Sequence, residues 1–298
     1  MRLIVLLSAY NGEPYIREQL DSLFAQTLDG VEILVRDDGS IDGTRAILAE
    51  YAQRGTLRWY AGENLGPARS FWQLLQDTPD AEYYAFCDQD DVWDADKLET
   101  AVKALVKLEG PALYCGDVRV TDEKLHVAAE HMVRPEPADY PHALIRNLAP
   151  GCTYVFNRAA RDLLCRFDAE SLGIELHDLT AYQIITCFGQ VIFDSEPHMS
   201  YRQHKGNAIG AHRTTAISLI KKLPAFWDGP QKNSRSRQAL RLERAYSDGM
   251  SPDRRELTAL YAHYREDRKA KRKLLMERKN LSGTARLLFI LAIFLNRL

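Results

Sequence analysis

Three aspartates in one short run are the residues of this chain best suited to hold a cation. Asp88, Asp90 and Asp91 follow the apolar residues 83–86, which predict a buried strand ending at the carboxylates. Two carboxylates about 4 Å apart repel by roughly 4 kcal/mol at an effective dielectric near 20. A divalent metal, a shared proton or an open aqueous site must therefore accompany them, and carboxylate oxygens favour Mg²⁺ or Mn²⁺. The alternative is a solvated acidic loop that caps the next helix.

A second acidic turn contains Asp38 and Gly39 and follows the strand candidate 32–36. A carboxylate beside a glycine turn can accept a hydrogen bond from a pyrimidine imide, while nearby backbone amides meet polar ligand atoms. The alternative is a simple turn in which Asp42 caps the following helix. The two acidic turns each follow a strand candidate, which favours one shared ligand site.

His177 and Asp178 open a helix candidate over residues 177–187. A carboxylate within hydrogen-bond reach of an acceptor hydroxyl can take its proton, which makes Asp178 a candidate general base. The alternative is a carboxylate that only offsets the dipole at a helix start. We expect His177 to shape the pocket.

Arg202 and His204 lie where a strand candidate ends in a loop. A guanidinium can neutralise phosphate oxygens with two hydrogen bonds, and an imidazole can donate to phosphate or ligate a metal. We predict that Arg202 meets the phosphates and leave metal ligation by His204 open, because a lone histidine is more often structural.

Strand and helix candidates alternate through the first two thirds of the chain, which predicts an α/β fold with a mostly parallel sheet covered by helices. In such folds ligands bind at the carboxyl ends of the strands. We expect residues 120–148 to form an irregular excursion over the site. The strand candidates are residues 3–7, 32–36, 57–60, 83–87, 112–118 and 153–156, and the helix candidates include 14–26, 44–54, 67–76, 97–108, 158–166 and 177–187.

The pattern changes near residue 210, which predicts a catalytic domain over residues 1–210 and a helical region over 211–298. Residues 265–279 carry eight Lys or Arg against three Asp or Glu, and the apolar run 287–295 follows. As a helix this run would extend only about 14 Å, against a bilayer core of about 30 Å. The combination suits peripheral contact with an anionic membrane. The alternative is packing on the catalytic domain or on another subunit.

The bulk composition excludes several classes of protein. With 298 residues, 46% of them hydrophobic and 27% charged, the chain is long enough for one large domain with an appendage. A formal charge of −2 offers no argument for nucleic acid. The five cysteines lack a Cys-x-x-Cys pair, which indicates reduced thiols. The apolar start, residues 1–7, is too short for a signal peptide.

Together these motifs resemble the family 2 glycosyltransferases of the GT-A fold, over roughly residues 1–210. The resemblance is carried by residues 8–12, 37–40, 64–69 and 88–91. It implies that Ser8, Tyr10 and Asp38 line a nucleoside pocket, that Asp88 approaches the ribose or the metal, and that Asp90 binds the cation. The other donor-binding residues expected from these motifs are Ala9, Asn11, Glu13, Gly39, Asn64, Gly66, Arg69 and Gln89, and those expected near the acceptor or pocket are Asp91, Trp93, Gly151, Cys152 and His177.

A narrower resemblance is to bacterial rhamnosyltransferases of this family, through residues 87–93, 150–153, 177–178 and 201–204. It implies a dTDP-L-rhamnose donor, Asp178 as catalytic base, and a cell-surface polysaccharide or lipid-linked saccharide as acceptor. It also implies work at the cytoplasmic face of a bacterial inner membrane. A UDP-hexose donor is the alternative within the same class.

The reaction expected of these parts is one in-line displacement that inverts the anomeric centre. A phosphotransfer enzyme also uses aspartates at strand ends, but Ser8-Ala9-Tyr10 stands where its Asp-x-Asp motif would follow the first strand. A sugar-nucleotide-binding or assembly protein without turnover is the non-enzymatic alternative, and Asp178 argues against it. The sequence leaves the acceptor, the linkage and homo-oligomer formation open.

Overall fold

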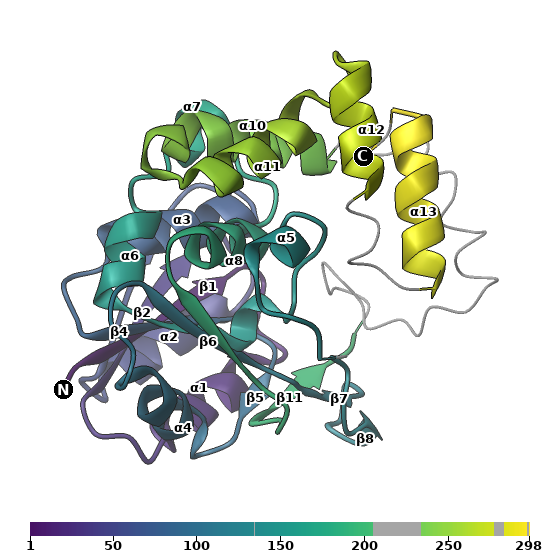
Figure 1. Cartoon of the computed structure of the whole chain (residues 1–298). Coiled ribbons are helices and arrows are strands. Elements are labelled where there is room, and N and C mark those ends of the chain that lie inside the picture. Colours follow the sequence, from purple (N-terminus) through teal and green to yellow (C-terminus); the bar gives the residue numbers. More distant parts are fainter. Residues whose placement is uncertain (134, 205–233, 277–282, 297) are drawn as a thin grey trace. The chain divides into compact units, whose positions relative to one another are not determined.

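The computed structural model describes residues 1–133, 135–204, 234–276, 283–296 and 298 (Figure 1). The chain divides into two compact units. The first consists of Met1–Ala138 and Asn147–Ala211, and the second of Asp139–Arg146 and His212–Leu298. Parts of the predicted helical region, residues 211–233, 277–282 and 297, lie outside the described residues.

A seven-stranded sheet forms the centre of the first unit, in the order β10-β6-β9-β4-β1-β2-β3. Strand β9 runs antiparallel to both of its neighbours, and the other neighbouring pairs are parallel. The predicted mostly parallel sheet is therefore confirmed. Its strands are β1 Leu3–Ala9, β2 Val31–Asp37, β3 Leu57–Ala61, β4 Tyr83–Cys87, β6 Ala112–Gly116, β9 Val155–Asn157 and β10 Gln190–Asp194.

Helices cover both faces of this sheet. Figure 1 shows α3, α6 and α8 on one side and α1 and α4 on the other. Helix α3 starts with Pro67 directly after Gly66, whose φ of 77° suits glycine and ends the preceding loop. The helices of this unit are α1 Ile16–Phe24, α2 Thr44–Ala52, α3 Pro67–Asp77, α4 Lys97–Leu105, α6 Arg158–Leu164, α7 Ala169–Leu172 and α8 His177–Phe188.

A second, four-stranded sheet lies beside the acidic motif, and two of its strands lie in or at the edge of residues 120–148, where the sequence predicted an irregular excursion. Its order is β5-β11-β7-β8, formed by β5 Val92–Trp93, β11 Met199–Arg202, β7 Arg119–Thr121 and β8 Val127–Ala129. The strand predicted over residues 153–156 is also corrected, because Gly151–Thr153 forms the 3₁₀ turn η1 and β9 begins at Val155. These strands are too short for a hydrophobic period to reveal.

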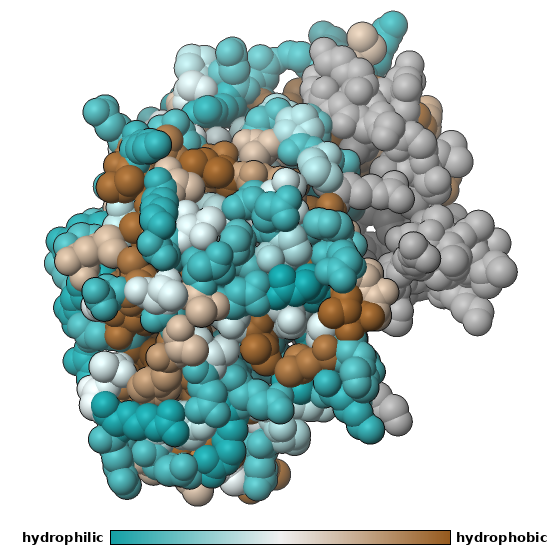
Figure 2. Space-filling model, turned by 90° about the horizontal axis from the view of Figure 1, so that it is seen from below, coloured by the Kyte–Doolittle hydropathy of each residue, from teal (hydrophilic) through white to brown (hydrophobic). Residues whose placement is uncertain are grey.

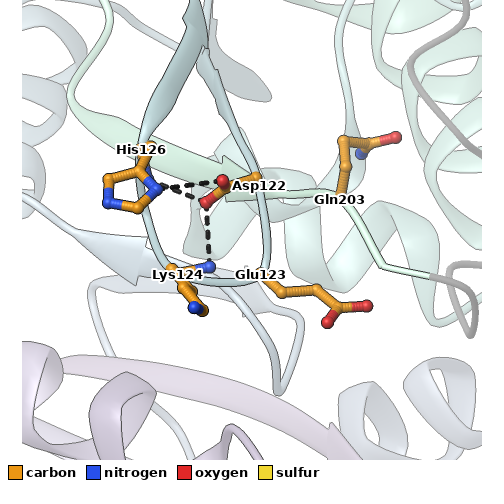
Figure 3. Close-up of a pocket in the computed structure, with 5 residues that line it drawn as sticks. All are labelled: Asp122, Glu123, Lys124, His126 and Gln203. Atoms are coloured by element: carbon orange, nitrogen blue, oxygen red, sulfur yellow. Dashed lines mark hydrogen bonds and ion pairs between the residues drawn. The ribbon is translucent and has the colours of Figure 1, made fainter.

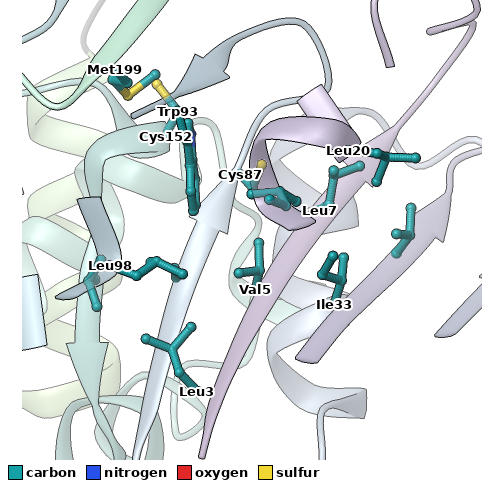
Figure 4. Packing of buried hydrophobic residues seen from close by; sticks show 14 of the residues in the cluster. Leu3, Val5, Leu7, Leu20, Ile33, Cys87, Trp93, Leu98, Cys152 and Met199 are labelled. Carbon is teal, nitrogen blue, oxygen red and sulfur yellow. The ribbon is translucent and has the colours of Figure 1, made fainter. Parts of the chain in front are cut away.

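The core of the first unit lies on both faces of β1. Residues 3–7 of this strand are at most 1% exposed, as expected for a central strand of a covered parallel sheet. Figure 4 shows Leu3, Val5 and Leu7 packed between Leu20 of α1 and Leu98 of α4. Burying one such side chain contributes roughly 1.5–3 kcal/mol to folding. This packing fixes the strand ends that carry the acidic turns.

The second unit is helical. The phenol of Tyr140 lies 2.7 Å from the hydroxyl of Thr258, and the ring of Phe289 lies 6.2 Å from that of Tyr261. No helix among the described residues is long and apolar enough to cross a membrane. The elements are α5 Tyr140–Ala143, α10 Ser234–Tyr246, η2 Ser247–Gly249, α11 Pro252–His263, α12 Arg268–Met276 and α13 Gly283–Phe294.

Candidate active site

The two acidic turns lie at the same edge of the sheet because their strands flank β1 and run parallel to it. In the sheet register, Leu7 pairs with Cys87 of β4 and Ala9 pairs with Asp37 of β2. The loops that follow these three strands therefore leave the same edge of the sheet. The Gln89 amide links two of them, since it accepts from the Tyr10 N–H at 2.8 Å and donates to the Tyr10 carbonyl at 2.9 Å.

The Asp38 carboxylate is 2% exposed and fully engaged by the protein. It forms an ion pair with Arg36 and accepts hydrogen bonds from the backbone N–H groups of Leu65 and Gly66, both at 2.9 Å. Arg36 also donates to Ser70 Oγ, which lies 2.6 Å from Ser8 Oγ. Asp38 thus ties the loop before α3 to the ends of β1 and β2. A role toward a nucleoside stays a prediction for Ser8 and Asp38.

The turn after β1 is tied to the Asp38 turn by side chains from both. Asn11, at φ 48°, accepts from the Ile41 N–H at 2.9 Å, and Glu13 accepts from the Gly43 N–H at 2.8 Å. Asn11 and Glu13 therefore position backbone in this structure. Of the other residues predicted to bind a donor, Tyr10, Asn64 and Arg69 are exposed, Ala9 is buried, and Gly39 and Gly66 are half-buried.

The Asp88 carboxyl interacts electrostatically with two other carboxylates, those of Asp90 and Asp178. Burial, together with the neighbouring charges of Asp90 and Asp178, raises the pKa of Asp88 to about 7. Residues 88 and 178 are far apart in sequence but near in space, so the structure brings the acidic motif and the predicted base together. Clustered carboxylates of this kind are typical of cation or catalytic sites.

Asp91 lies deeper than Asp88, at 0% exposure. Its Oδ1 accepts from the Arg202 N–H at 3.1 Å, while Oδ2 is buried and has no N–H or O–H donor among the described residues. Ligand atoms of Asp88, Asp91 and Cys152 all lie within 4.8 Å of one another. The orphaned oxygen and the mainly carboxylate donor set fit Mg²⁺ or Mn²⁺.

A buried lysine lies behind this group. The ammonium of Lys97 lies 3.4 Å from the centre of the Trp93 ring, and burial lowers the pKa of Lys97 to about 8. Trp93 itself is 3% exposed and packs in the hydrophobic core, as does Cys152. Trp93, predicted near the acceptor, is therefore not brought to the surface of the site.

Asp90 and His204 form a close pair, with 2.6 Å between Asp90 Oδ2 and His204 Nε2. The His204 ring stacks on Tyr15 at 4.5 Å. The Arg202 guanidinium donates to the carbonyls of Asp90 and Glu123, each at 2.8 Å, and pairs with Glu18. Arg202 therefore clamps β11 to the acidic loop, and its predicted contact with phosphate stays a prediction. Tyr15, Glu18 and Glu123 were not predicted from the sequence.

Asp178 stands in the first turn of α8, held from three sides. Its Oδ1 accepts from the Leu179 N–H at 2.7 Å and its Oδ2 from Asn147 Nδ2 at 2.8 Å. A Cβ added to Gly151 would lie 2.8 Å from Asp178 Cβ and 2.9 Å from His177 Nε2, so only glycine fits there without a shift. The His177 ring stacks on Phe71 at 4.0 Å, and burial lowers the pKa of His177.

A hollow of about 400 Å³ opens beside the β7–β8 turn, and the sequence did not predict it (Figure 3). Its lining residues are Asp122, Glu123, Lys124, His126 and Gln203. Asp122 shapes the turn by accepting from the Lys124 and His126 N–H groups, both at 2.9 Å. Because Glu123 and Gln203 adjoin the Arg202 clamp, this hollow lies at the rim of the acidic site.

Comparison with known proteins places this chain in a known family. The model of Glycosyl transferase family 2 matches residues 4–163. The chain is 27% identical to the dTDP-rhamnosyl transferase RfbG of Shigella flexneri, over 69% of this chain and 74% of that protein. It is 28% identical to the uncharacterized glycosyltransferase RT0329 of Rickettsia typhi, over 76% of this chain and 70% of that protein.

Solved structures share the fold at low sequence identity. Residues 1–349 of S. aureus TarS in complex with UDP-GlcNAc superpose with a TM-score of 0.61 at 15% identity, over 96% of this chain and 83% of that one. The mannosyltransferase PcManGT of Pyrobaculum calidifontis, in complex with GDP-Man and Mn²⁺, gives 0.53 at 19% identity, over 99% and 80%. These likenesses establish the architecture of the central sheet and its helices.

Proposed function

The chain belongs to glycosyl transferase family 2 and is a glycosyltransferase with a GT-A fold. We propose that it transfers a sugar from a nucleoside-diphosphate donor with inversion of configuration at the anomeric carbon. The acceptor is a hydroxyl of a growing cell-surface polysaccharide or lipid-linked saccharide. The observation that supports this proposal is that the charge of Asp178 acts on the Asp88 carboxyl of the acidic motif and, with burial and Asp90, raises its pKa. That arrangement supplies a base beside a site suited to a diphosphate and its cation.

The residues of the site divide the work between activation and binding. Asp178 takes the proton of the acceptor hydroxyl as its oxygen attacks the anomeric carbon and the bond to the nucleoside diphosphate breaks. Ser8, Tyr10 and Asp38 lie at the edge where the nucleoside would bind. The Asp178 carboxylate is held by two N–H donors, and this fixed orientation favours the geometry in which it can react.

A divalent cation fits the acidic motif. We propose that Asp90 and Asp88 hold Mg²⁺ or Mn²⁺, with His204 and Asp91 as the neighbouring groups. When bound, such a cation neutralises charge on the diphosphate leaving group. Asp90 is exposed enough to reach a ligand, at 15% of its side chain, whereas Asp91 is buried.

We favour dTDP-L-rhamnose as the donor, supported by the likeness to RfbG. A UDP-hexose is the alternative, since a protein with this fold is known in complex with UDP-GlcNAc. The test is calorimetric titration of dTDP-rhamnose and several UDP-sugars with Mg²⁺ or Mn²⁺, followed by transfer to polysaccharide fragments. We expect dTDP-rhamnose to bind most tightly and to be transferred. Preference for a UDP-hexose would overturn the rhamnose assignment alone, while donor binding without any transfer or hydrolysis would favour a silent binding protein.

We also propose that residues 1–210 form the catalytic domain, and that residues 211–298 bring the enzyme to the cytoplasmic face of a bacterial inner membrane. Helix α12 exposes Arg268, Lys269 and Arg272. Phe294, at the end of α13, is 62% exposed, whereas Phe289 and Ile293 are buried. Exposed cations beside an apolar tip suit anionic headgroups. Figure 2 shows another face, where hydrophobic residues form separate small groups among hydrophilic ones.

Flotation with anionic vesicles checks the membrane contact. Each Lys or Arg near such a surface contributes about 1 kcal/mol, so replacing Arg268, Lys269 and Arg272 with glutamate should release the protein from the vesicles. High salt should do the same. The matched control replaces Arg17, an exposed arginine of α1, with glutamate. This substitution should leave vesicle binding unchanged. Vesicle binding that ignores both salt and the triple substitution would refute the proposal.

A further inference from the structure

Asn147 makes the one side-chain hydrogen bond that the described structure records on Asp178. The amide Nδ2 donates to Asp178 Oδ2 at 2.8 Å, and the second oxygen accepts from the Leu179 N–H at 2.7 Å. Each carboxylate oxygen offers about two acceptor sites. One site on each oxygen therefore stays available for the proton of a substrate hydroxyl.

The orientation of the Asn147 amide is fixed by its other contacts. Its Oδ1 accepts from the Tyr154 hydroxyl at 2.5 Å and from the Leu148 N–H at 3.2 Å. The Leu148 backbone N–H can only donate. If the Asn147 amide were flipped, its Nδ2 donor would face this N–H donor. Burial raises the pKa of Tyr154 well above its ordinary value, so its hydroxyl keeps the proton that it donates to Asn147 Oδ1. Hence Nδ2 must face Asp178.

We propose that Asn147 is a positioning residue for the general base, and that Tyr154 in turn positions Asn147. This inference rests on the proposed function of Asp178. The line Tyr154, Asn147, Asp178 holds the carboxylate beside Gly151, a position where any added Cβ would lie 2.8 Å from Asp178 Cβ. A shift of about 1 Å in a reacting group can cost about 10²-fold in rate. Asn147 would thus set turnover without touching the substrate.

The test compares kcat and KM for variants of Asn147 in two backgrounds. Asn147→Ala should lower kcat by roughly 10- to 100-fold with little change in donor KM. Asn147→Asp keeps the shape but sets a carboxylate against Asp178, so it should lose at least as much. Tyr154→Phe should lose less, because the Leu148 N–H still orients the amide.

The second background is Asp178→Asn, assayed at high enzyme concentration. If Asn147 acts only through the base, adding Asn147→Ala there should cause no further loss, since coupled residues are not additive. The inference would be overturned if Asn147→Ala lowered kcat by the same factor in the Asp178→Asn background as in the native enzyme. Full activity of Asn147→Ala in the otherwise native enzyme would overturn it as well. Full activity of Asp178→Asn alone would instead reject the base assignment, which separates the two failures.

Asn157→Ala is the matched control. Asn157 also uses both ends of its amide, accepting from the Ala160 N–H at 3.0 Å and donating to the Gly110 carbonyl at 2.8 Å. These contacts cap α6 and do not involve the site. Removing the Asn157 side chain should therefore lower the melting temperature and leave kcat unchanged. Asn147→Ala should lower kcat as well as the melting temperature, because it also removes the acceptor of the buried Tyr154 hydroxyl.

Discussion

Replacing Asp178 with asparagine is expected to lower kcat by about 10²- to 10⁴-fold, the usual contribution of a general base. The amide keeps the size of the side chain but cannot take the proton of the acceptor hydroxyl. Donor affinity should be retained, because the residues predicted to bind the nucleoside and diphosphate lie outside α8, the helix that carries Asp178. The measurement is steady-state transfer, paired with calorimetric titration of the donor.

Asp168→Asn separates catalysis from a helix-start effect. Asp168 precedes α7, and its carboxylate accepts from the backbone N–H groups of Glu170 and Ser171 at 3.1 and 3.0 Å. It therefore shares with Asp178 a place at the start of a helix, without the neighbouring acidic motif. We expect Asp168→Asn to leave kcat unchanged. Equal kcat in Asp178→Asn and the native enzyme would show that Asp178 only offsets the helix dipole.

Replacing Asp90 with alanine is expected to weaken metal-dependent donor binding by at least about 10- to 100-fold, a cost seen even for residues that merely support metal ligands. Turnover should fall by about 10²- to 10³-fold, since charge stabilisation of this kind amounts to several kcal/mol. The Arg202 clamp should persist, because Arg202 Nε donates to the Asp90 backbone carbonyl. Calorimetry with Mn²⁺ and with EDTA gives the comparison.

In EDTA the Asp90→Ala variant and the native protein should bind the donor with equal affinity, because the contribution that Asp90 makes to donor binding requires the cation. Asp96→Ala is the control: its carboxylate is exposed and lies 3.2 Å from His198 Nδ1, in a separate acidic group. Its metal dependence should match that of the native protein. If Asp90→Ala retained native affinity with Mn²⁺, Asp90 would not be the metal ligand.

The central sheet could be predicted because local patterns dominate there. The strand predicted over residues 83–87 matches β4, Tyr83–Cys87, since a short apolar run bounded by polar residues has few other solutions in a covered sheet. Helix α1 lies inside its predicted range, 14–26, and is shorter at both ends. Helix ends depend on caps and tertiary contacts, which a hydrophobic period does not encode.

The four-stranded sheet as a whole escaped prediction because its pairing is not local, although the strand candidate ending near Arg202 matches β11. Strand β5 contains only Val92 and Trp93, and it pairs with Met199 and Ser200 of β11. Two-residue strands have no measurable period. Their pairing is defined only once the central sheet has brought the two segments together.

The candidate site was predictable at the level of carboxylates and strand ends, but not at the level of their partners. Aspartates after neighbouring parallel strands must share an edge, which the sequence pattern already indicates. The Asn147 amide reaches Asp178 across 31 positions, and Glu18 reaches Arg202 across 184. No motif spacing marks such pairs, because the fold creates them.

Locating a bound Mn²⁺ tests most directly whether Asp88, Asp90 and Asp178 surround one activated-sugar site. Crystals grown with Mn²⁺ and a nucleoside diphosphate would give an anomalous signal at the metal position. We predict a peak at the Asp90 carboxylate, with the diphosphate beside it and Asp178 facing the sugar position. A peak at the Asp94, Asp96 and His198 group instead, or a diphosphate bound away from Asp90 and Asp178, would contradict the account.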